Sequence, residues 1–151
     1  LYGAARITHN EKVSYLTVIT LNAQPEGLTA YQGQQPDLTR FTFAGLTALD
    51  KNYGHVHIRP DTATDKLIEL FKPVKVKFEA DQDFHKRYHV TADNPEHLKA
   101  QMTASFLAII KQHEGLQVEM KDHDILVRLP KGFSVDVAEQ LGAFLVGMKE
   151  V

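Results

Sequence analysis

The sequence contains no cysteine. This absence excludes disulfide bonds, thiolate metal ligands and thiol nucleophiles together. No apolar run approaches the roughly 18 residues that a membrane-spanning helix needs. Basic residues are not in excess, because the formal net charge is −2, so the chain lacks the electrostatic attraction that nucleic acids and membrane surfaces require. We therefore expect no nucleic-acid partner, and membrane contact only through a segment outside this chain.

The local signatures of common enzymes are also missing. The chain has no glycine loop for phosphate, no His-Glu-x-x-His zinc motif and no nucleophile elbow. Glu79, Asp81 and Asp83 alternate in a way that suits a hard cation, but the segment lacks the glycine and the final glutamate of a calcium loop. The sequence predicts no catalytic residue, no cofactor, no cofactor-binding residue and no metal ligand, so we expect a protein that is not an enzyme.

What is present is the composition of one globular domain. Hydrophobic residues make up 43% of the 151 residues, and a chain of this length buries about two-thirds of its unfolded surface in a single core. The chain begins at Leu1 and not at a methionine. We therefore interpret residues 1–151 as a single soluble domain excised from a longer protein.

Segments rich in β-branched and aromatic residues, separated by turn residues, predict strands. The clearest is 74–78, where apolar residues alternate with Lys75 and Lys77. Segment 13–21 is apolar on both alternations, which favours a strand buried on both faces. Gly45 indicates a bulge or a bend. The expected strands are 13–21, 27–31, 38–49, 55–59, 74–78, 84–91, 115–120 and 125–129, the last two joined by a hairpin turn at 121–124.

Three segments carry helical signals. A short helix is expected over about 64–71, where Pro73 ends it, and two longer helices over about 95–113 and 135–149. Ser134 is a good N-cap for the last of these, whose expected inward stripe consists of Val137, Leu141, Phe144, Leu145 and Met148. Several strands come first, followed by a strand, a helix, a hairpin and a helix. This order predicts an α+β fold with a mainly antiparallel sheet, and not a parallel sheet of alternating βαβ units.

The expected helix 95–113 has two unlike faces. Its inward stripe consists of Leu98, Met102, Phe106, Ile109 and Ile110. Leu107 points the opposite way, onto a back face of small side chains that consists of Ala100, Ala104 and Ala108. We expect another element of the same domain to cover this back face. A second subunit, which would make the protein a homo-oligomer, is the alternative.

Three histidines, His85, His89 and His97, cluster in one short segment. Alternation through residues 84–91 predicts a strand that leads into a capped helix, with His97 in the first helical turn. Residues four apart on a strand lie about 13 Å apart, whereas a metal ion requires its nitrogen ligands within about 2.1 Å. This geometry argues against an ion shared by His85 and His89, and we interpret the segment as structural.

His55 and His57 are the better metal candidates. Two residues apart on a strand, they share a face, with Cα atoms about 6.6 Å apart, which is close enough to bind one ion. No third ligand is indicated by spacing. The favoured interpretation is the polar face of an amphipathic strand that Arg59 continues, and a metal-dependent hydrolase using both histidines with a distant carboxylate is the alternative.

Three pieces of the segment 41–129 each carry a distinct pattern. They are FTFAGLTALDKNYGHVHIRPD, VKFEADQDFHKRYHVTADNPEHLKAQMTASFL and LQVEMKDHDILVRL. They carry a Phe-x-Gly-Leu and Asp-x-Asn progression, an acidic turn followed by a long helix, and a hairpin. In these features the chain resembles a family of bacterial proteins of unknown function. It departs from the family at residues 99–101, which read Lys-Ala-Gln where members often have Ala-Arg-Tyr.

Members of this family typically carry transmembrane segments ahead of a soluble C-terminal domain. The resemblance implies a membrane-embedded part upstream, with this domain on the cytoplasmic side, and it brings no catalytic residues. Our preferred hypothesis is a non-catalytic soluble domain of a membrane-associated bacterial protein that binds a protein partner or a small ligand. The metal-dependent hydrolase using His55 and His57 is one rival, and a module with an apolar ligand cavity between sheet and helices is another.

Overall fold

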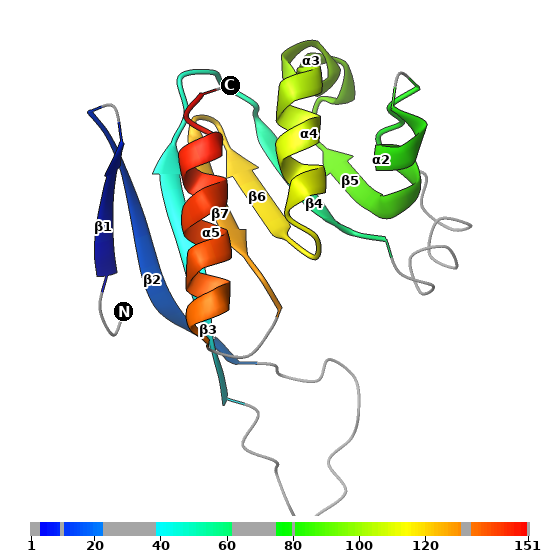
Figure 1. The fold of residues 1–151 in the computed structure, drawn as a ribbon. Helices are drawn as coiled ribbons and strands as arrows, with labels where there is room; N and C mark the ends of the chain where they lie inside the picture. Colours follow the sequence, from blue (N-terminus) through cyan, green and yellow to red (C-terminus); the bar gives the residue numbers. More distant parts are fainter. Residues whose placement is uncertain are drawn as a thin grey trace, which may run out of the picture.

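The computed structural model describes residues 4–9, 11–22, 39–61, 75–79, 81–130 and 134–150. These residues form one seven-stranded sheet with four helices packed along one face (Figure 1). The strand order is β1-β2-β3-β7-β6-β4-β5, and every neighbouring pair is antiparallel. The predicted α+β class with a mainly antiparallel sheet is confirmed.

The strands are β1 (Ala4–His9), β2 (Lys12–Asn22), β3 (Thr39–Ala48), β4 (His55–Pro60), β5 (Tyr88–Ala92), β6 (Gln117–Lys121) and β7 (Asp124–Arg128). The helices are α2 (Gln82–Arg87), α3 (Pro95–Gln101), α4 (Ala104–Gln112) and α5 (Val135–Gly147). The strand expected at 27–31 and the short helix expected at about 64–71 lie outside the described residues. No helix in the described part of the chain is long and apolar enough to cross a membrane.

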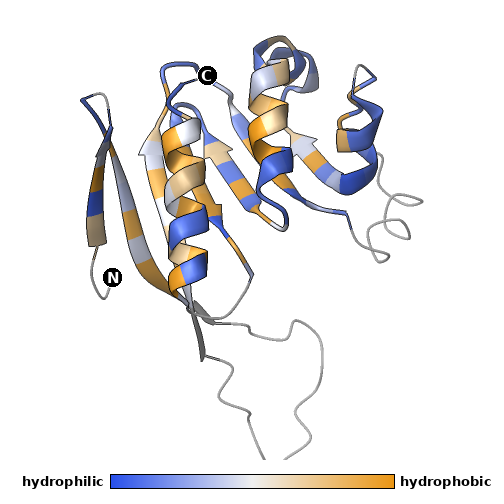
Figure 2. Ribbon diagram, viewed as in Figure 1, coloured by the Kyte–Doolittle hydropathy of each residue, from blue (hydrophilic) through white to orange (hydrophobic). Residues whose placement is uncertain are grey.

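The alternation of apolar residues along β4 decides which way its side chains point. Val56 and Ile58 are buried in the core, whereas His55 and His57 are exposed. Figure 2 shows the same alternation as hydrophobic and hydrophilic bands along the strands. The inward side chains of the sheet and the inner faces of the helices make one continuous hydrophobic core. The face of the sheet that bears the two histidines is turned away from this core.

Strand β2 is buried at some positions on both faces, at Ser14 on one and at Thr17 on the other, but the burial expected from its composition is incomplete. Ser14 is 1% exposed, whereas its neighbour Tyr15 is 45% exposed. β-Branched and aromatic residues favour a strand through its backbone and local packing, but burial requires a second layer. In the described residues the helices supply that layer on one side of the sheet.

Helix α5 packs over β2 and β3. The Ser134 side chain accepts a hydrogen bond from the Val137 amide and caps the helix. The expected inward stripe is fully confirmed, because Val137, Leu141, Phe144, Leu145 and Met148 are all buried. The buried side of α5 therefore covers part of the hydrophobic core.

Gly45 allows α5 to approach the sheet closely. A Cβ atom built on Gly45 would lie 2.8 Å from Leu145 Cδ1 and 2.9 Å from Val127 Cγ1. The ladder runs through this residue without interruption, pairing Gly45 with Leu16 on β2 and with Val127 on β7. The glycine therefore serves close packing and produces no bulge.

The strand expected over 84–91 is wrong in its first half, because residues 82–87 form α2 and β5 begins at Tyr88. Asp81 caps α2 by accepting a hydrogen bond from the Phe84 amide at 3.0 Å. Phe84 is fully buried and stacks on Tyr88 with ring centroids 4.8 Å apart. A helix of six residues is too short for a helical period to be read, and its capping and burial decide the conformation.

The helix expected over 95–113 is divided into α3 and α4. Met102 and Thr103 adopt extended backbone between them, and the Thr103 side chain caps α4 by accepting from the Phe106 amide at 3.2 Å. This restart turns Leu107 inward, where it is 6% exposed, although a continuous helix would place it outside. The expected back face is divided between α3, which carries Ala100, and α4, which carries Ala104 and Ala108. All three residues are exposed, contrary to the expectation that another element covers them.

The segment 75–78 is extended but is not a strand of the sheet. Val76 and Phe78 are buried and Lys77 is exposed, as the alternation predicted. The Val76 amide donates to the Val90 carbonyl at 2.8 Å, which ties this segment to the edge of β5. Lys75, which was also expected to point outward, has a side chain only 11% exposed because it pairs with Asp61. The side-chain pattern is therefore confirmed for Val76, Lys77 and Phe78 and wrong for Lys75, and the regular ladder that defines a strand is missing here.

Candidate metal site

His55 and His57 project from β4 onto the sheet face that lies opposite the helices. Strand β4 is paired on both sides, with β5 and with β6. Its backbone is therefore held by two ladders, which limits how far the two histidines can shift relative to their neighbours. Both side chains are exposed, so a solute can reach them.

Glu119 on β6 is brought beside these histidines by strand pairing. The register places Glu119 directly opposite His57, and residues that are paired directly across two antiparallel strands point to the same face. Val118 and Met120, on either side of Glu119, are buried. The carboxylate consequently points to the same open face as the histidines.

The β6–β7 hairpin fixes the pairing of β6 with its other neighbour, β7. Asp122 lies in the turn with a φ of 56°, a left-handed conformation that a short polar side chain tolerates. The turn pairs Lys121 with Asp124, and two steps along the ladder it pairs Glu119 with Leu126. A hairpin turn at 121–124 was predicted, and it is confirmed.

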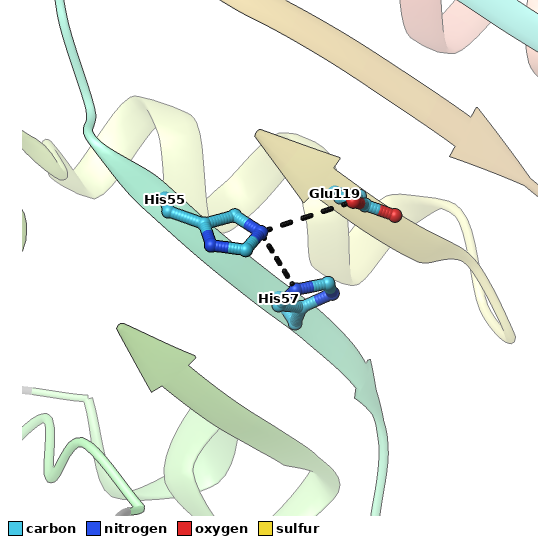
Figure 3. A group of neighbouring side chains, drawn as sticks. All are labelled: His55, His57 and Glu119. Carbon is cyan, nitrogen blue, oxygen red and sulfur yellow. Dashed lines mark hydrogen bonds and ion pairs between the residues drawn. The ribbon is translucent and has the colours of Figure 1, made fainter. Parts of the chain in front are cut away.

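The ligand atoms of His55, His57 and Glu119 converge (Figure 3). The Nε2 atoms of the two histidines are 3.0 Å apart, and His55 Nε2 lies 3.9 Å from Glu119 Oε1. One ligand atom from each residue lies within 4.8 Å of the others. Tetrahedral zinc, with bonds of about 2.0–2.1 Å, needs ligand atoms about 3.3 Å apart. Small side-chain rotations are enough to reach this geometry.

A second carboxylate, that of Asp93, lies near the other ring nitrogen of His55. His55 Nδ1 lies 3.6 Å from Asp93 Oδ2, within ion-pair range. A histidine that binds a metal through one ring nitrogen usually donates the other N–H to a carboxylate or carbonyl, which fixes its tautomer and orientation. Asp93 is in the right place to play this part. The arrangement thus has three candidate ligands and one candidate supporting residue.

A shallow hollow of about 60 Å³ opens beside these ligands on the same face. His57 and Glu119 line one side of it, and Arg59, Gln117 and Arg128 line the other. The Arg128 Nε–H donates to Gln117 Oε1 at 2.8 Å. An ion held by the three ligands would therefore have a hollow with two guanidinium groups next to it.

The other histidines have structural surroundings. His85 lies on α2 and His89 on β5, so the two no longer share one element. A ring nitrogen of His97 bonds to the Asn52 carbonyl at 2.9 Å. The His113 ring meets the Phe144 ring edge-on at 5.7 Å, and burial lowers the pKa of His113. Within the described residues, the group able to hold a metal ion is His55, His57 and Glu119.

Glu119 is the site residue that the sequence did not reveal. Its alternation with Val118 and Met120 places it on the polar face of a strand, and this much is readable. The missing information was that β6 pairs with β4, a strand about sixty residues earlier in the chain. Segment 55–59 and segment 115–120 carry no local signal of that pairing.

No family model, no curated protein and no solved structure matches the chain. The inference of function therefore rests on the geometry of the sheet face.

Proposed function

We propose that this domain is a binding module for a divalent transition-metal ion, held by His55, His57 and Glu119. The observation that carries the proposal is the convergence of the three ligand atoms within 4.8 Å of one another. Imidazole nitrogens suit zinc, nickel and copper, and two histidines with one carboxylate are an established zinc donor set. This ion is the small ligand of the binding module that the sequence favoured.

Two features support binding over catalysis. The three ligands are exposed on an open sheet face, whereas catalytic sites exclude bulk water. A metal-bound water also needs a general base. Among the residues that line the hollow, Glu119 is the sole carboxylate, and in the proposed site it is already a ligand. A metal-dependent hydrolase remains the second candidate, because two histidines and a glutamate with an open position are also a catalytic zinc set.

The first test is a metal titration of protein purified without a histidine tag and stripped with a chelator. We expect one Zn²⁺ per chain, and an increase of about 2.7 kcal/mol in the free energy of unfolding at a free Zn²⁺ concentration 100 times the dissociation constant. Replacement of both histidines by glutamine (His55→Gln with His57→Gln) should abolish both effects. Glu119→Gln should weaken binding about tenfold or more.

Matched controls carry the same substitutions elsewhere on the surface. Glu139→Gln on α5 and His123→Gln in the hairpin turn alter exposed residues outside the ligand set. They should leave the affinity and stoichiometry unchanged. Absence of stoichiometric metal in the wild type, or equal affinity in the glutamine double variant, would refute the proposal. Hydrolysis of ester or amide substrates by the zinc-loaded protein would favour the second candidate.

We further propose that the module belongs to a membrane-associated bacterial protein and lies at the cytoplasmic side. The support for this location is the resemblance of segment 41–129 to a family whose members carry transmembrane segments ahead of such a domain. Fractionation of the full-length gene product tests it, and recovery of that product free of membranes would contradict it.

A protein partner or a second copy of the chain is also part of the proposal. It is supported by the exposed small side chains of Ala104 and Ala108, which lie one turn apart on α4. A mass measurement in solution tests self-association. If the chain self-associates through this part of α4, replacement of Ala104 by arginine should convert the oligomer into monomers.

A further inference from the structure

Two arginines line the hollow beside the metal ligands. Two guanidinium groups, those of Arg59 and Arg128, line it together with the side chains of His57 and Glu119. Arg128 is half-buried. In the part of the chain that the structure describes, its side chain donates a hydrogen bond to the neutral Gln117 amide and not to a carboxylate. With a divalent ion in place, the charges of Glu119 and Asp93 balance the ion, and the guanidinium of Arg128 remains to attract an anion.

Strand pairing aligns the two halves of this hollow. His57, Glu119 and Leu126 lie in one row across β4, β6 and β7. Gln117 and Arg128 are paired in the next row on the same face, and Arg59 lies two residues beyond His57 along β4. Adjacent rows on one face of a sheet are about 6.6 Å apart. A group bound between them touches an arginine on one side and the metal on the other.

On this basis, and resting on the proposed metal site, we propose that the hollow binds the oxyanion group of a small molecule, a carboxylate or a phosphate. Arginine presents several N–H donors in a planar fork that matches the oxygens of such groups. A further oxygen of the same group completes the coordination of the metal, because three protein ligands leave a fourth position open. A hollow of about 60 Å³ holds a few water molecules, and one carboxylate or phosphate group takes their place.

The ordering of Arg128 supports its role. Its Nε–H is held by Gln117 at 2.8 Å, so the guanidinium plane is oriented before a ligand arrives, and less conformational entropy is lost on binding. The terminal nitrogens of the fork are left for the anion. Leu126 provides an apolar wall of the same hollow, which strengthens the electrostatic interaction by excluding water.

The test uses the tag-free chain and Co²⁺, whose visible absorption reports its coordination sphere. Co²⁺ is first titrated into the wild type, Arg128→Gln and the control Glu139→Gln. All three should take up one Co²⁺ with equal affinity, which also shows that the variants are folded. Acetate and inorganic phosphate are then titrated separately, at constant ionic strength, into the Co²⁺-loaded and the metal-free proteins.

In the wild type and in the control, we expect one of the two anions to shift the Co²⁺ spectrum at a lower concentration than the other anion does. The anion that acts at the lower concentration identifies the bound group as carboxylate or phosphate. The metal-free protein should bind the same anion about tenfold or more weakly. Arg128→Gln should also weaken anion binding about tenfold or more, as expected for loss of a charge-assisted hydrogen bond, while Arg128→Lys restores part of it.

Two failures are distinguishable. If Co²⁺ does not bind, the metal site itself is refuted, and the anion proposal falls with it. The anion proposal is refuted if Co²⁺ binds with equal affinity in all three proteins but neither anion alters its spectrum. It is also refuted if Arg128→Gln binds the anion as tightly as the wild type does. In both cases the proposed metal site stands.

Discussion

The same substitution, glycine to alanine, should have opposite effects at two positions where α5 and the sheet meet, Gly45 on the sheet and Gly142 on the helix. At Gly45 on β3 an added Cβ atom would lie 2.8 Å from Leu145 Cδ1 and 2.9 Å from Val127 Cγ1, distances well inside van der Waals contact. Leu145 and Val127 are both fully buried, so neither can move its side chain into solvent. Relief requires a shift of α5 or an unfavourable rotamer.

The magnitude follows from these contacts. Overpacking of a well-packed core costs about 1–3 kcal/mol. Replacing glycine by alanine also restricts the unfolded chain, which offsets about 0.4–1 kcal/mol. Taking the middle of both ranges, Gly45→Ala should lower the free energy of unfolding by about 1.3 kcal/mol. At Gly142 on α5 the nearest atom, Ile7 Cδ1, is 3.7 Å from the added Cβ, and Gly142→Ala should raise stability by up to about 1 kcal/mol, the helix-propensity gain.

Urea unfolding at equilibrium is the assay. With a slope of about 2 kcal/mol per M, the midpoint of Gly45→Ala should fall by about 0.5–1 M with an unchanged slope, while that of Gly142→Ala should rise. Shortening Leu145 to valine in the Gly45→Ala background should cost less than it does alone, because it opens the required space. A Gly45→Ala variant as stable as the wild type would refute the close approach of α5 to β3.

Two further predictions concern buried charge and pH. Asp61 and Lys75 form an ion pair of 2.7 Å, and their side chains are only 6% and 11% exposed. Asp61→Ala should therefore lower the free energy of unfolding in urea by about 3 kcal/mol. The exposed pair of Glu96 and Lys99 provides the control, and Glu96→Ala should lower it by about 0.5 kcal/mol or less. Equal costs would contradict the burial of the first pair. Burial lowers the pKa of His113 below its ordinary 6.5, so the folded state binds fewer protons than the unfolded state just below pH 6.5, and stability should fall as the pH drops through that value and level off below the folded pKa. In the presence of a chelator His113→Gln should remove part of this pH dependence, and an unchanged pH profile would contradict the assignment.

Much of the fold could be read from the sequence because local patterns carried it. The alternation in 55–59 correctly placed Val56 and Ile58 inside and the histidines outside. The inward stripe of the last helix and its Ser134 cap were likewise readable, since a helix of thirteen residues presents several full turns of periodicity. Element type and the facing of side chains are short-range properties of these segments.

The misread segments are those where a short-range signal competed with a tertiary contact. Helix α2 is too short to show a period, and it forms because Asp81 caps it and Phe84 is drawn into the core. The division between α3 and α4 likewise depends on packing, since the Thr103 cap allows both Met102 and Leu107 to be buried. In both cases capping and burial outweigh the pattern of the residues alone.

By itself the sequence determined the class of fold, the face on which His55 and His57 stand, and the absence of thiol chemistry. The tertiary structure alone decided that the pair has a third ligand, because it paired β6 with β4 and set Glu119 opposite His57. The physical reason is that strand order and register depend on the core as a whole and on the turns that join the strands. A side chain's neighbours across a sheet are therefore not written in the residues beside it in the chain.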